Sequence, residues 1–309
     1  MPRNRDHMDQ LTFPDMVENR PLLETDVAQS LRPGSPPPSY ARQHGCLYTA
    51  DCLDFLHMLR PEAASFVFAD PPFDSPPVWD RTVPSDAYLA WSLSWIQEAA
   101  RILSPTGCLC ICGPDELLAD LKRPALSCFA ECRLLVWYYR NRSPAGMDWG
   151  ESHQDLLLLF KGAVHPMHTD LVRIPYEKHT IRYYQNRPDG KNRWHPHPLG
   201  AKPKDVLEVP ALFSGTAEKT AHPDQKPEAL LRRLLLAHTD PDDLVVDPFS
   251  GSGTTAVAAE QLGRRWLGGD SDGVWHELAV QRLDHVPLRS IDEWIAYDRR
   301  RTETRESMR

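Results

Sequence analysis

The chain has 309 residues, of which 41% are hydrophobic and 25% are charged, a balance typical of a soluble globular protein. This length suits one large domain, or a core domain with a smaller insertion. No apolar run reaches the roughly 18 residues of a membrane helix, and the charged N-terminus lacks the apolar stretch of a secretory signal, so we expect a cytoplasmic protein that spans no membrane.

The net charge of −8 by itself disfavours a nucleic-acid partner, but the charges are unevenly distributed. Residues 173–204 carry eight Lys or Arg and two acidic residues, which gives a local charge of +6 and leaves −14 for the rest of the chain. A basic region on an acidic protein focuses the attraction for a polyanion on one face. Nucleic acid therefore stays open as a partner.

The seven cysteines are odd in number and show no disulfide framework. Cys108, Cys110 and Cys112 alternate, so they would share one face of a strand. They could bind zinc, but no second pair of ligands lies nearby in the sequence, and free cysteine usually behaves as a small buried apolar residue. We therefore expect no metal site.

The first half of the chain reads as a tail followed by an α/β pattern. Residues 1–43 include a Pro-rich stretch and lack sustained periodicity, which predicts a disordered segment. From residue 44, apolar spacing predicts a short helix over 53–59, a buried strand over 66–69 and a helix from about Ser85 to 103. Further strands of the same sheet are predicted for the cysteine run and for 134–139 and 156–160.

A long irregular region interrupts this pattern. Residues 161–221 are rich in Pro, His, Arg and Tyr and are too many for an ordinary loop, which indicates an inserted functional region. The α/β pattern resumes with helices over 227–238 and 254–262, strands over 244–246 and 265–269, and a last helix opened by a capping box at residues 290–293. Together these elements predict an α/β fold with a doubly wound, mostly parallel sheet and helices on both faces.

A glycine-rich loop, Gly251 to Ala256, lies between a predicted strand and a predicted helix. Glycine lets the backbone approach a ligand closely, and the helix N-terminus offers unpaired N–H groups. Asp270, 19 residues after Gly251, ends the next strand and can accept hydrogen bonds from a ribose. This pattern suits NAD and S-adenosylmethionine alike, but Asp247, directly before the turn, favours the latter, whose positive α-ammonium needs a carboxylate partner.

A second loop, Asp70-Pro-Pro-Phe73, follows the buried strand over 66–69. The prolines remove two backbone donors, so the loop presents only acceptors, namely the Asp70 carboxylate and the Pro71 carbonyl, beside the flat face of Phe73. Acceptors that hold the N–H bonds of a ring-attached amine favour a pyramidal nitrogen that can attack an electrophilic methyl group. Taken alone, the same residues also suit a simple strand-ending turn.

These motifs resemble those of the beta class of DNA amino-methyltransferases. Residues 67–73 look like the catalytic motif of that family, and residues 247–255 look like its S-adenosylmethionine loop. Residues 222–227 are similar to its His-Pro-Thr-Gln-Lys-Pro segment, although Asp224 replaces the usual Thr. The order of catalytic loop, variable region and cofactor loop is that of the beta class, so the resemblance implies a Rossmann-like methyltransferase fold that uses S-adenosylmethionine.

The resemblance assigns residue roles as follows. The catalytic residues would be Asp70, Pro71, Pro72 and Phe73. The cofactor would contact Asp51, Lys226, Asp247, Phe249, Gly251, Ser252, Gly253, Thr254 and Asp270. Double-stranded DNA would contact basic and aromatic residues of the insertion, namely Arg173, Lys178, Arg182, Tyr184, Arg187, Lys191, Arg193 and Trp194.

The composition and periodicity, together with the resemblance, divide the chain into segments. Residues 1–43 would be a disordered tail, and residues 44–160 would form the catalytic half of the domain. The target-recognition insertion would span 161–221, and the cofactor-binding half would span 222–286. A C-terminal helix with a basic tail would span 287–309. Members of this class often pair up and accompany restriction enzymes, so a homodimer and a cognate restriction endonuclease are further expectations.

The target base follows from the first residue of the catalytic loop. Family members that act on N6 of adenine usually begin this loop with Asp or Asn, and those that act on N4 of cytosine usually begin it with Ser. Asp70 therefore favours adenine, in a base flipped out of the duplex. N4 of cytosine is the alternative. An NAD-dependent oxidoreductase would leave the Asp70 loop unexplained, and a catalytically silent DNA-binding protein would be expected to show a broken motif.

Overall fold

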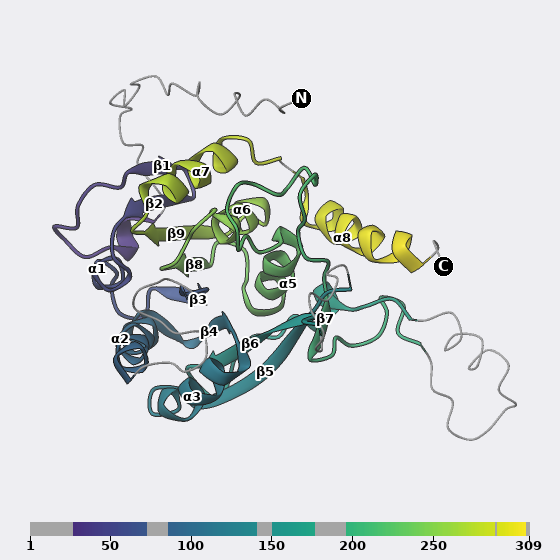
Figure 1. Cartoon of the computed structure of the whole chain (residues 1–309), viewed down its shortest axis with the longest axis horizontal. Helices are drawn as coiled ribbons and strands as arrows, with labels where there is room; N and C mark the ends of the chain where they lie inside the picture. The colour runs from purple at the N-terminus through teal and green to yellow at the C-terminus, as the bar shows by residue number, and fades with distance from the viewer. Residues whose placement is uncertain (1–26, 73–85, 141–149, 177–195, 288, 307–309) are drawn as a thin grey trace, which may run out of the picture.

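Within residues 27–72, 86–140, 150–176, 196–287 and 289–306, which the computed structural model describes, a nine-stranded sheet forms the centre of the protein (Figure 1). Its strands lie in the order β1-β2-β9-β8-β3-β4-β6-β5-β7. The bounds are β1 Tyr40–Arg42, β2 Gly45–Thr49, β3 Ala64–Ala69, β4 Leu103–Gly113, β5 Glu131–Tyr138, β6 His153–Phe160, β7 Val206–Glu208, β8 Leu244–Asp247 and β9 Arg265–Asp270.

The central strands β2, β9, β8, β3 and β4 run parallel to one another. β1 is antiparallel to β2, and β6 is antiparallel to both β4 and β5. β7 extends the far edge in parallel with β5. The sheet is therefore mixed but mostly parallel, as the sequence predicts.

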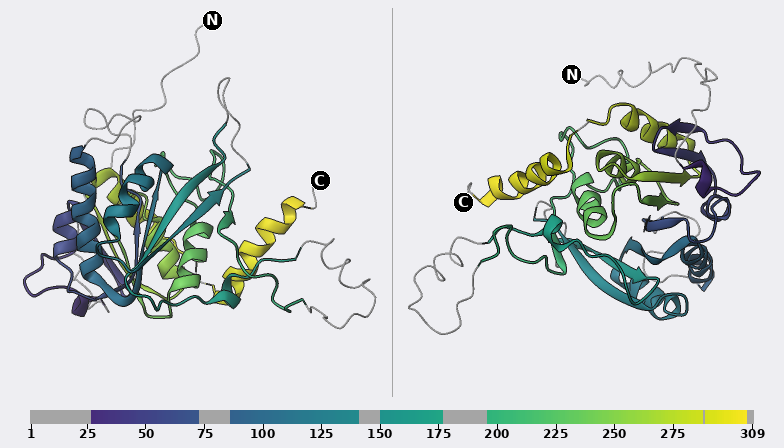
Figure 2. Two further views of the ribbon diagram at one scale, coloured as in Figure 1. Left: turned by 90° about the horizontal axis from the view of Figure 1, so that it is seen from below. Right: turned by 180° about the vertical axis from the view of Figure 1, so that it is seen from behind.

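Helices cover both faces of the sheet (Figure 2). One face carries α1 Cys52–His57, α2 Asp86–Ile102 and α3 Asp115–Ala125, and the other carries α5 Glu228–His238, α6 Thr254–Gln261, α7 Gly273–Asp284 and α8 Ile291–Glu306. Alternate residues of β3 point to opposite cores: Phe66 and Phe68 pack on the α5 side, and Val67 and Ala69 on the α2 side.

The order of the strands places the two predicted loops next to each other. From β8 the chain crosses through α6 to β9 on one side, and from β3 it crosses through α2 to β4 on the other. The strand order reverses between β8 and β3, which pair in parallel with Val67 opposite Val246. Ligands of open α/β sheets bind at such a switch point, outside the carboxyl ends of the strands. Asp70 and Asp247 end up at this point.

The three cysteines of β4 share one face, as their alternation predicts. Cys108, Cys110 and Cys112 all lie in the core between the sheet and α5, with exposures of 2% or less. Burial raises the pKa of each thiol above its ordinary value. They are buried apolar residues rather than reactive thiols.

The prediction that residues 1–43 are disordered is wrong for residues 27–43. Residues 27–43 are ordered: they include a 3-10 turn, Ala28–Ser30, and strand β1, and Val27 is fully buried. The Tyr40 hydroxyl donates to the Asp284 carboxylate of α7 across 244 residues of sequence. Such long-range contacts leave no local periodicity to detect. The prediction for residues 1–26 lies outside the described part of the chain.

The predicted boundary at residue 161 does not separate the insertion from the main domain. Strand β7, inside the predicted insertion, pairs with β5, and a 3-10 turn over Thr169–Val172 packs against α5. The described parts of the insertion therefore belong to the main sheet and its α5 side. The last helix begins as predicted, because Ser290 and Glu293 form the reciprocal bonds of a capping box.

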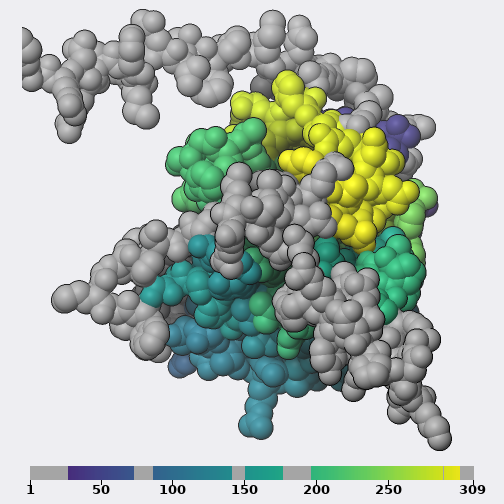
Figure 3. Space-filling model, turned by 90° about the vertical axis from the view of Figure 1, so that its right-hand side faces the viewer, coloured from purple at the N-terminus to yellow at the C-terminus, as the bar shows by residue number. Residues whose placement is uncertain are grey.

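Helix α8 lies on the surface of the molecule (Figure 3). It packs through Trp294 against the α5 side of the core, and the Arg289 guanidinium lies 4.8 Å above the Tyr297 ring. Among the described helices, none is long and apolar enough to span a membrane.

Candidate active site

A cleft of about 650 Å³ opens at the carboxyl ends of β3, β8 and β9. Eight of the nine residues predicted to bind the cofactor line it, together with three of the four predicted catalytic residues, Asp70, Pro71 and Pro72. The predicted cofactor-binding residue that does not line the cleft is Gly253. The fourth predicted catalytic residue, Phe73, lies outside the described residues. The topology thus brings together motifs that are about 180 residues apart in the sequence.

The glycine loop requires its glycines for steric reasons. Gly251 and Gly253 have φ angles of +46° and +73°, which side chains rarely adopt. A Cβ on Gly251 would lie 2.9 Å from His222 Nε2, and one on Gly253 would lie 2.7 Å from Ala279 Cβ. Gly253 therefore serves the packing of the loop against α7, which explains its absence from the cleft wall.

Asp270 holds the glycine loop to the end of β9. Its Oδ2 accepts the Gly251 N–H at 2.7 Å, and its Oδ1 accepts the Asp272 N–H at 2.9 Å. A carboxylate has about four lone-pair positions, so Asp270 can still accept bonds from a ligand hydroxyl in the cleft. Asp51, across the cleft, similarly accepts the Leu53 N–H as the N-cap of α1.

Asp247 is a buried carboxylate that has no cationic partner among the described residues. It is 4% exposed, and burial raises its pKa to about 7, although hydrogen bonds from Thr255 and the Phe249 N–H partly oppose the shift. A carboxylate in this state is stabilised by a cation that enters the cleft. The residues present thus fit S-adenosylmethionine, which carries an α-ammonium and a sulfonium.

The Asp70 carboxylate pairs with a lysine from the other half of the domain. Lys226 Nζ lies 2.5 Å from Asp70 Oδ2 and also donates to the Asp224 carbonyl at 3.2 Å. Burial by itself lowers the pKa of Lys226, but Asp70, Cys112 and Asp224 outweigh it and raise the pKa above its ordinary value. Lys226 thus holds the carboxylate through Oδ2, and the Cys112 thiol is a second hydrogen-bonding neighbour of Asp70.

The resemblance assigns Lys226 to the cofactor, but its side chain contacts the Asp70 carboxylate. Its backbone bonds to the glycine loop, where the Lys226 carbonyl accepts the Thr254 hydroxyl at 3.2 Å. The ammonium therefore fixes the orientation of Asp70. Sequence spacing could not show this contact, because the two residues are 156 positions apart.

The resemblance gives Asp70 the target amine to hold. Replacing Lys226 with methionine should then lower kcat by about 10²-fold, because a misplaced Asp70 would no longer align that amine. The Kd of S-adenosylmethionine, measured by calorimetry, should change by less than about threefold, since no charge-assisted bond to the cofactor is lost. Lys122, exposed on α3, supplies a matched Lys→Met control. A large rise in Kd at unchanged kcat would instead support the cofactor role.

Several cleft residues were not predicted as site residues. Trp91 of α2 contacts Phe249 with ring centroids 5.8 Å apart, and it offers an aromatic wall beside the glycine loop. Gln154 of β6 lies beside the Asp70 loop, within 3.7 Å of Cys112. Trp275 of α7 packs on His222 at 4.6 Å. The similarity of residues 222–227 to a family segment could have identified His222 as a site residue. Trp91 and Gln154 lie on a helix and a strand whose apolar pattern indicates only packing.

Of the eight residues predicted to bind DNA, Arg173 alone lies in the described part of the chain. Its guanidinium bonds to Asp170 Oδ1 at 2.6 Å and to the Gly200 carbonyl at 2.9 Å. These bonds join the two ends of the insertion, so the structure gives Arg173 a structural role. The other seven, Lys178, Arg182, Tyr184, Arg187, Lys191, Arg193 and Trp194, lie outside the described residues.

Comparison with known proteins agrees with the geometry of the cleft. A family model for N6 and N4 methyltransferases, described as DNA methylase, matches residues 64–281. The chain is 26% identical over 281 residues to the DNA adenine methyltransferase YhdJ of Escherichia coli (strain K12), covering 88% of this chain and 94% of that protein. It is 27% identical over 267 residues to the type II methyltransferase M.BglII of Bacillus subtilis, covering 82% of this chain and 73% of the relative.

Solved structures show the same fold. The PvuII DNA methyltransferase (cytosine-N4-specific) aligns with a TM-score of 0.63 at 19% identity, over 85% of this chain and 94% of that one. The complex of M1.HpyAVI with S-adenosylmethionine aligns with a TM-score of 0.54 at 21% identity, over 78% of this chain and 99% of that one. Because the family match runs from β3 into α7 and includes both loops of the cleft, the chain belongs to the DNA methylase family, whose methyl donor is S-adenosylmethionine.

Proposed function

We propose that the protein transfers a methyl group to N6 of adenine in double-stranded DNA, acting on a base flipped out of the duplex. The observation that carries this proposal is the Asp70 carboxylate at the cleft wall, which Lys226 holds through Oδ2. An Asp at this position is typical of the adenine enzymes of the family. The 26% identity to a relative named as a DNA adenine methyltransferase supports the same base.

The roles of the side chains follow from their positions. S-adenosylmethionine supplies an electrophilic methyl group when bound. Asp247, Asp270 and the glycine loop would hold it, with Asp247 facing its positive charge. Asp70 Oδ1 and the Pro71 carbonyl would accept the two N–H bonds of the target amine. Both acceptors stabilise the positive charge that grows on the nitrogen during transfer, so no enzyme nucleophile is needed.

The proposal is tested by identifying the product. Unmethylated genomic DNA is incubated with the enzyme and S-adenosylmethionine, digested to nucleosides and separated by chromatography with mass detection. We expect N6-methyladenine. N4-methylcytosine would assign the alternative base while keeping the amine chemistry of Asp70. Absence of any methylated nucleoside, with DNA from several sources and a cofactor-binding enzyme, would overturn the proposed activity.

We propose that the basic insertion, residues 161–221, contacts the DNA. Replacing Lys191 and Arg193 together with Gln should weaken DNA binding and lower the slope of log Kd against log salt by about two, because two phosphate contacts are lost. The measurement is fluorescence anisotropy over a series of salt concentrations. A matched pair, Lys122 and Arg123 on the exposed face of α3, serves as the control. An unchanged slope in the Lys191/Arg193 variant would remove these residues from the interface.

We further propose a homodimer and a cognate restriction endonuclease as partners. Several relatives, M.BglII and M1.MboII among them, are named type II methyltransferases, which supports an association with restriction. The dimer is tested by sedimentation of the purified protein with and without DNA. A monomer under both conditions would exclude it.

A further inference from the structure

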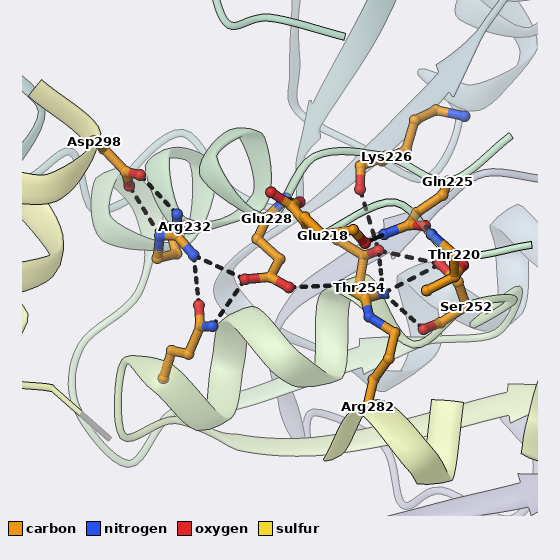
Figure 4. A network of polar contacts seen from close by, with 11 residues as sticks. Glu218, Thr220, Gln225, Lys226, Glu228, Arg232, Ser252, Thr254, Arg282 and Asp298 are labelled. Atoms are coloured by element: carbon orange, nitrogen blue, oxygen red, sulfur yellow. Dashed lines mark hydrogen bonds and ion pairs between the residues drawn. The ribbon is translucent and has the colours of Figure 1, made fainter. Parts of the chain in front are cut away.

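A polar network behind the cleft joins the cofactor loop to helix α8 (Figure 4). Its first member, Arg282 of α7, does not line the cleft. The Arg282 guanidinium donates to the Ser252 carbonyl at 2.7 Å and to the Thr254 hydroxyl at 2.9 Å. Its other nitrogen pairs with Glu228 Oε1 at 2.7 Å. One side chain therefore holds the turn of the glycine loop and the start of α5 together.

Glu228 is the centre of the network. Its Oε2 accepts from Arg232 at 3.2 Å and from Gln261 of α6 at 2.8 Å. Its backbone N–H donates to Glu218 at 2.6 Å, which caps the first turn of α5. The carboxylate therefore receives hydrogen bonds from three helices, α5, α6 and α7.

Arg232 carries the network out to α8. Its side chain is 1% exposed, and it forms two parallel bonds to Asp298, at 2.9 Å and 2.6 Å. Two guanidinium groups thus face two carboxylates, Glu228 and Asp298, at short distances. Buried ions need this pairing because an unpaired charge in the interior is strongly unfavourable. Planar guanidinium forks also fix the relative orientation of the groups they join.

The network reaches both parts of the site. Thr254, held by Arg282, donates its hydroxyl to the Lys226 carbonyl at 3.2 Å, and Glu228 follows Lys226 by two residues. The Lys226 side chain in turn anchors Asp70. The cofactor loop and the catalytic carboxylate are therefore set relative to each other through Arg282 and Glu228. Transfer between two bound groups depends steeply on such placement, with about 10²-fold lost for a 1 Å shift.

We infer that Arg282 and Glu228 are positioning residues for the cofactor loop, and that Asp298 of α8 supports them from the protein surface. This inference rests on the proposed function, since it assigns the loop to S-adenosylmethionine. It gives the C-terminal helix a part in cofactor binding, although none of the described side chains of α8 lines the cleft. The effects of Arg282, Glu228 and Asp298 on the free energy of cofactor binding are then coupled.

The first test uses Arg282→Gln and Glu228→Gln in the full chain. Each should raise the Kd of S-adenosylmethionine, measured by calorimetry, by about tenfold, as expected when a charge-assisted bond that holds the loop is lost. Hydrogen exchange of the loop amides at 251–257 should become faster in the protein without cofactor. Where Arg282→Gln fails to fold, Arg282→Lys keeps the charge but loses the planar fork, so it tests the same bonds.

The second test addresses α8. Asp298→Asn should raise the same Kd by about threefold, the size typical of a coupled residue without ligand contact. Asp292→Asn, an exposed change on the same helix, should leave it unchanged. The effects of Arg282→Gln and Asp298→Asn should be less than additive, because both act through Glu228.

Unchanged Kd and unchanged loop exchange in folded Arg282 and Glu228 variants would overturn the inference and reduce the network to a stabilising role. Both readouts are made without DNA. A wild-type enzyme that binds S-adenosylmethionine but methylates no base would overturn the proposed function and leave this inference standing.

Discussion

Replacing Asp70 with asparagine should lower kcat for methyl transfer by about 10³-fold, while the Kd of S-adenosylmethionine changes by less than about threefold. The amide keeps the size of the side chain but turns one acceptor into a donor. It can no longer hold an N–H bond of the target amine with a negative charge, nor stabilise the positive charge that forms on the nitrogen. Steady-state assays give kcat, single-turnover assays give the rate constant of the transfer step itself, and calorimetry gives Kd.

The choice of substitution matters because Asp70 is paired with a buried lysine. Asp70→Asn removes the charge but keeps an oxygen that can accept from Lys226. Asp70→Ala leaves this buried cation with no carboxylate or amide acceptor at position 70, which costs about 3–5 kcal/mol of stability. A lost activity could then reflect unfolding. The double variant Asp70→Ala with Lys226→Met removes both charges, so it should regain much of the thermal stability but none of the activity.

These variants separate a catalytic role from a structural one. If Asp70→Asn weakens cofactor binding as much as it lowers kcat, Asp70 supports the cleft rather than the substrate. If the double variant methylates DNA at the wild-type rate, the carboxylate is not the acceptor for the target amine.

The site could be predicted to a large extent because its main residues lie in short, continuous sequence motifs. Asp70 and Asp247 each end a strand that apolar runs identify, and the parallel topology of an α/β fold brings such strand ends to one edge. The glycine loop was recognisable because its positive φ angles and close contacts need glycine. Each motif is continuous in the sequence, and the structure places the motifs in one cleft.

The contacts between the motifs could not be predicted. The ion pair between Lys226 and Asp70, and the bonds from Arg282 to Glu228 and Thr254, join residues that are 28 to 156 positions apart. Arg and Glu on amphipathic helices look like solvent-exposed charges in a sequence, and only packing shows that Arg232 is buried. For the same reason Trp91 reads as core packing, although its ring also forms part of the cleft wall.

Replacing Asp247 with asparagine should weaken S-adenosylmethionine binding by about 10²-fold at pH 8, since a buried charge pair in a cleft is worth several times more than an exposed one. The same change should raise the Tm of the protein without cofactor. Burial raises the pKa of Asp247 to about 7 in the fold, against an ordinary value of 3.8. The folded state thus holds a proton that the unfolded chain releases, so stability falls as the pH rises from about 4 to 7. Asparagine carries no such charge.

Cofactor binding should show the opposite dependence on pH. The positive α-ammonium favours the ionised carboxylate, so binding near neutral pH should release a proton, and the wild-type affinity should increase as the pH rises toward 7 and level off above it. Calorimetry in two buffers of different ionisation enthalpy detects the proton directly. Asp247→Asn should bind weakly at every pH and release none. A wild-type Kd that is constant from pH 5.5 to 8, an interval we choose to bracket the shifted pKa of about 7, would show that Asp247 does not face the cofactor's charge.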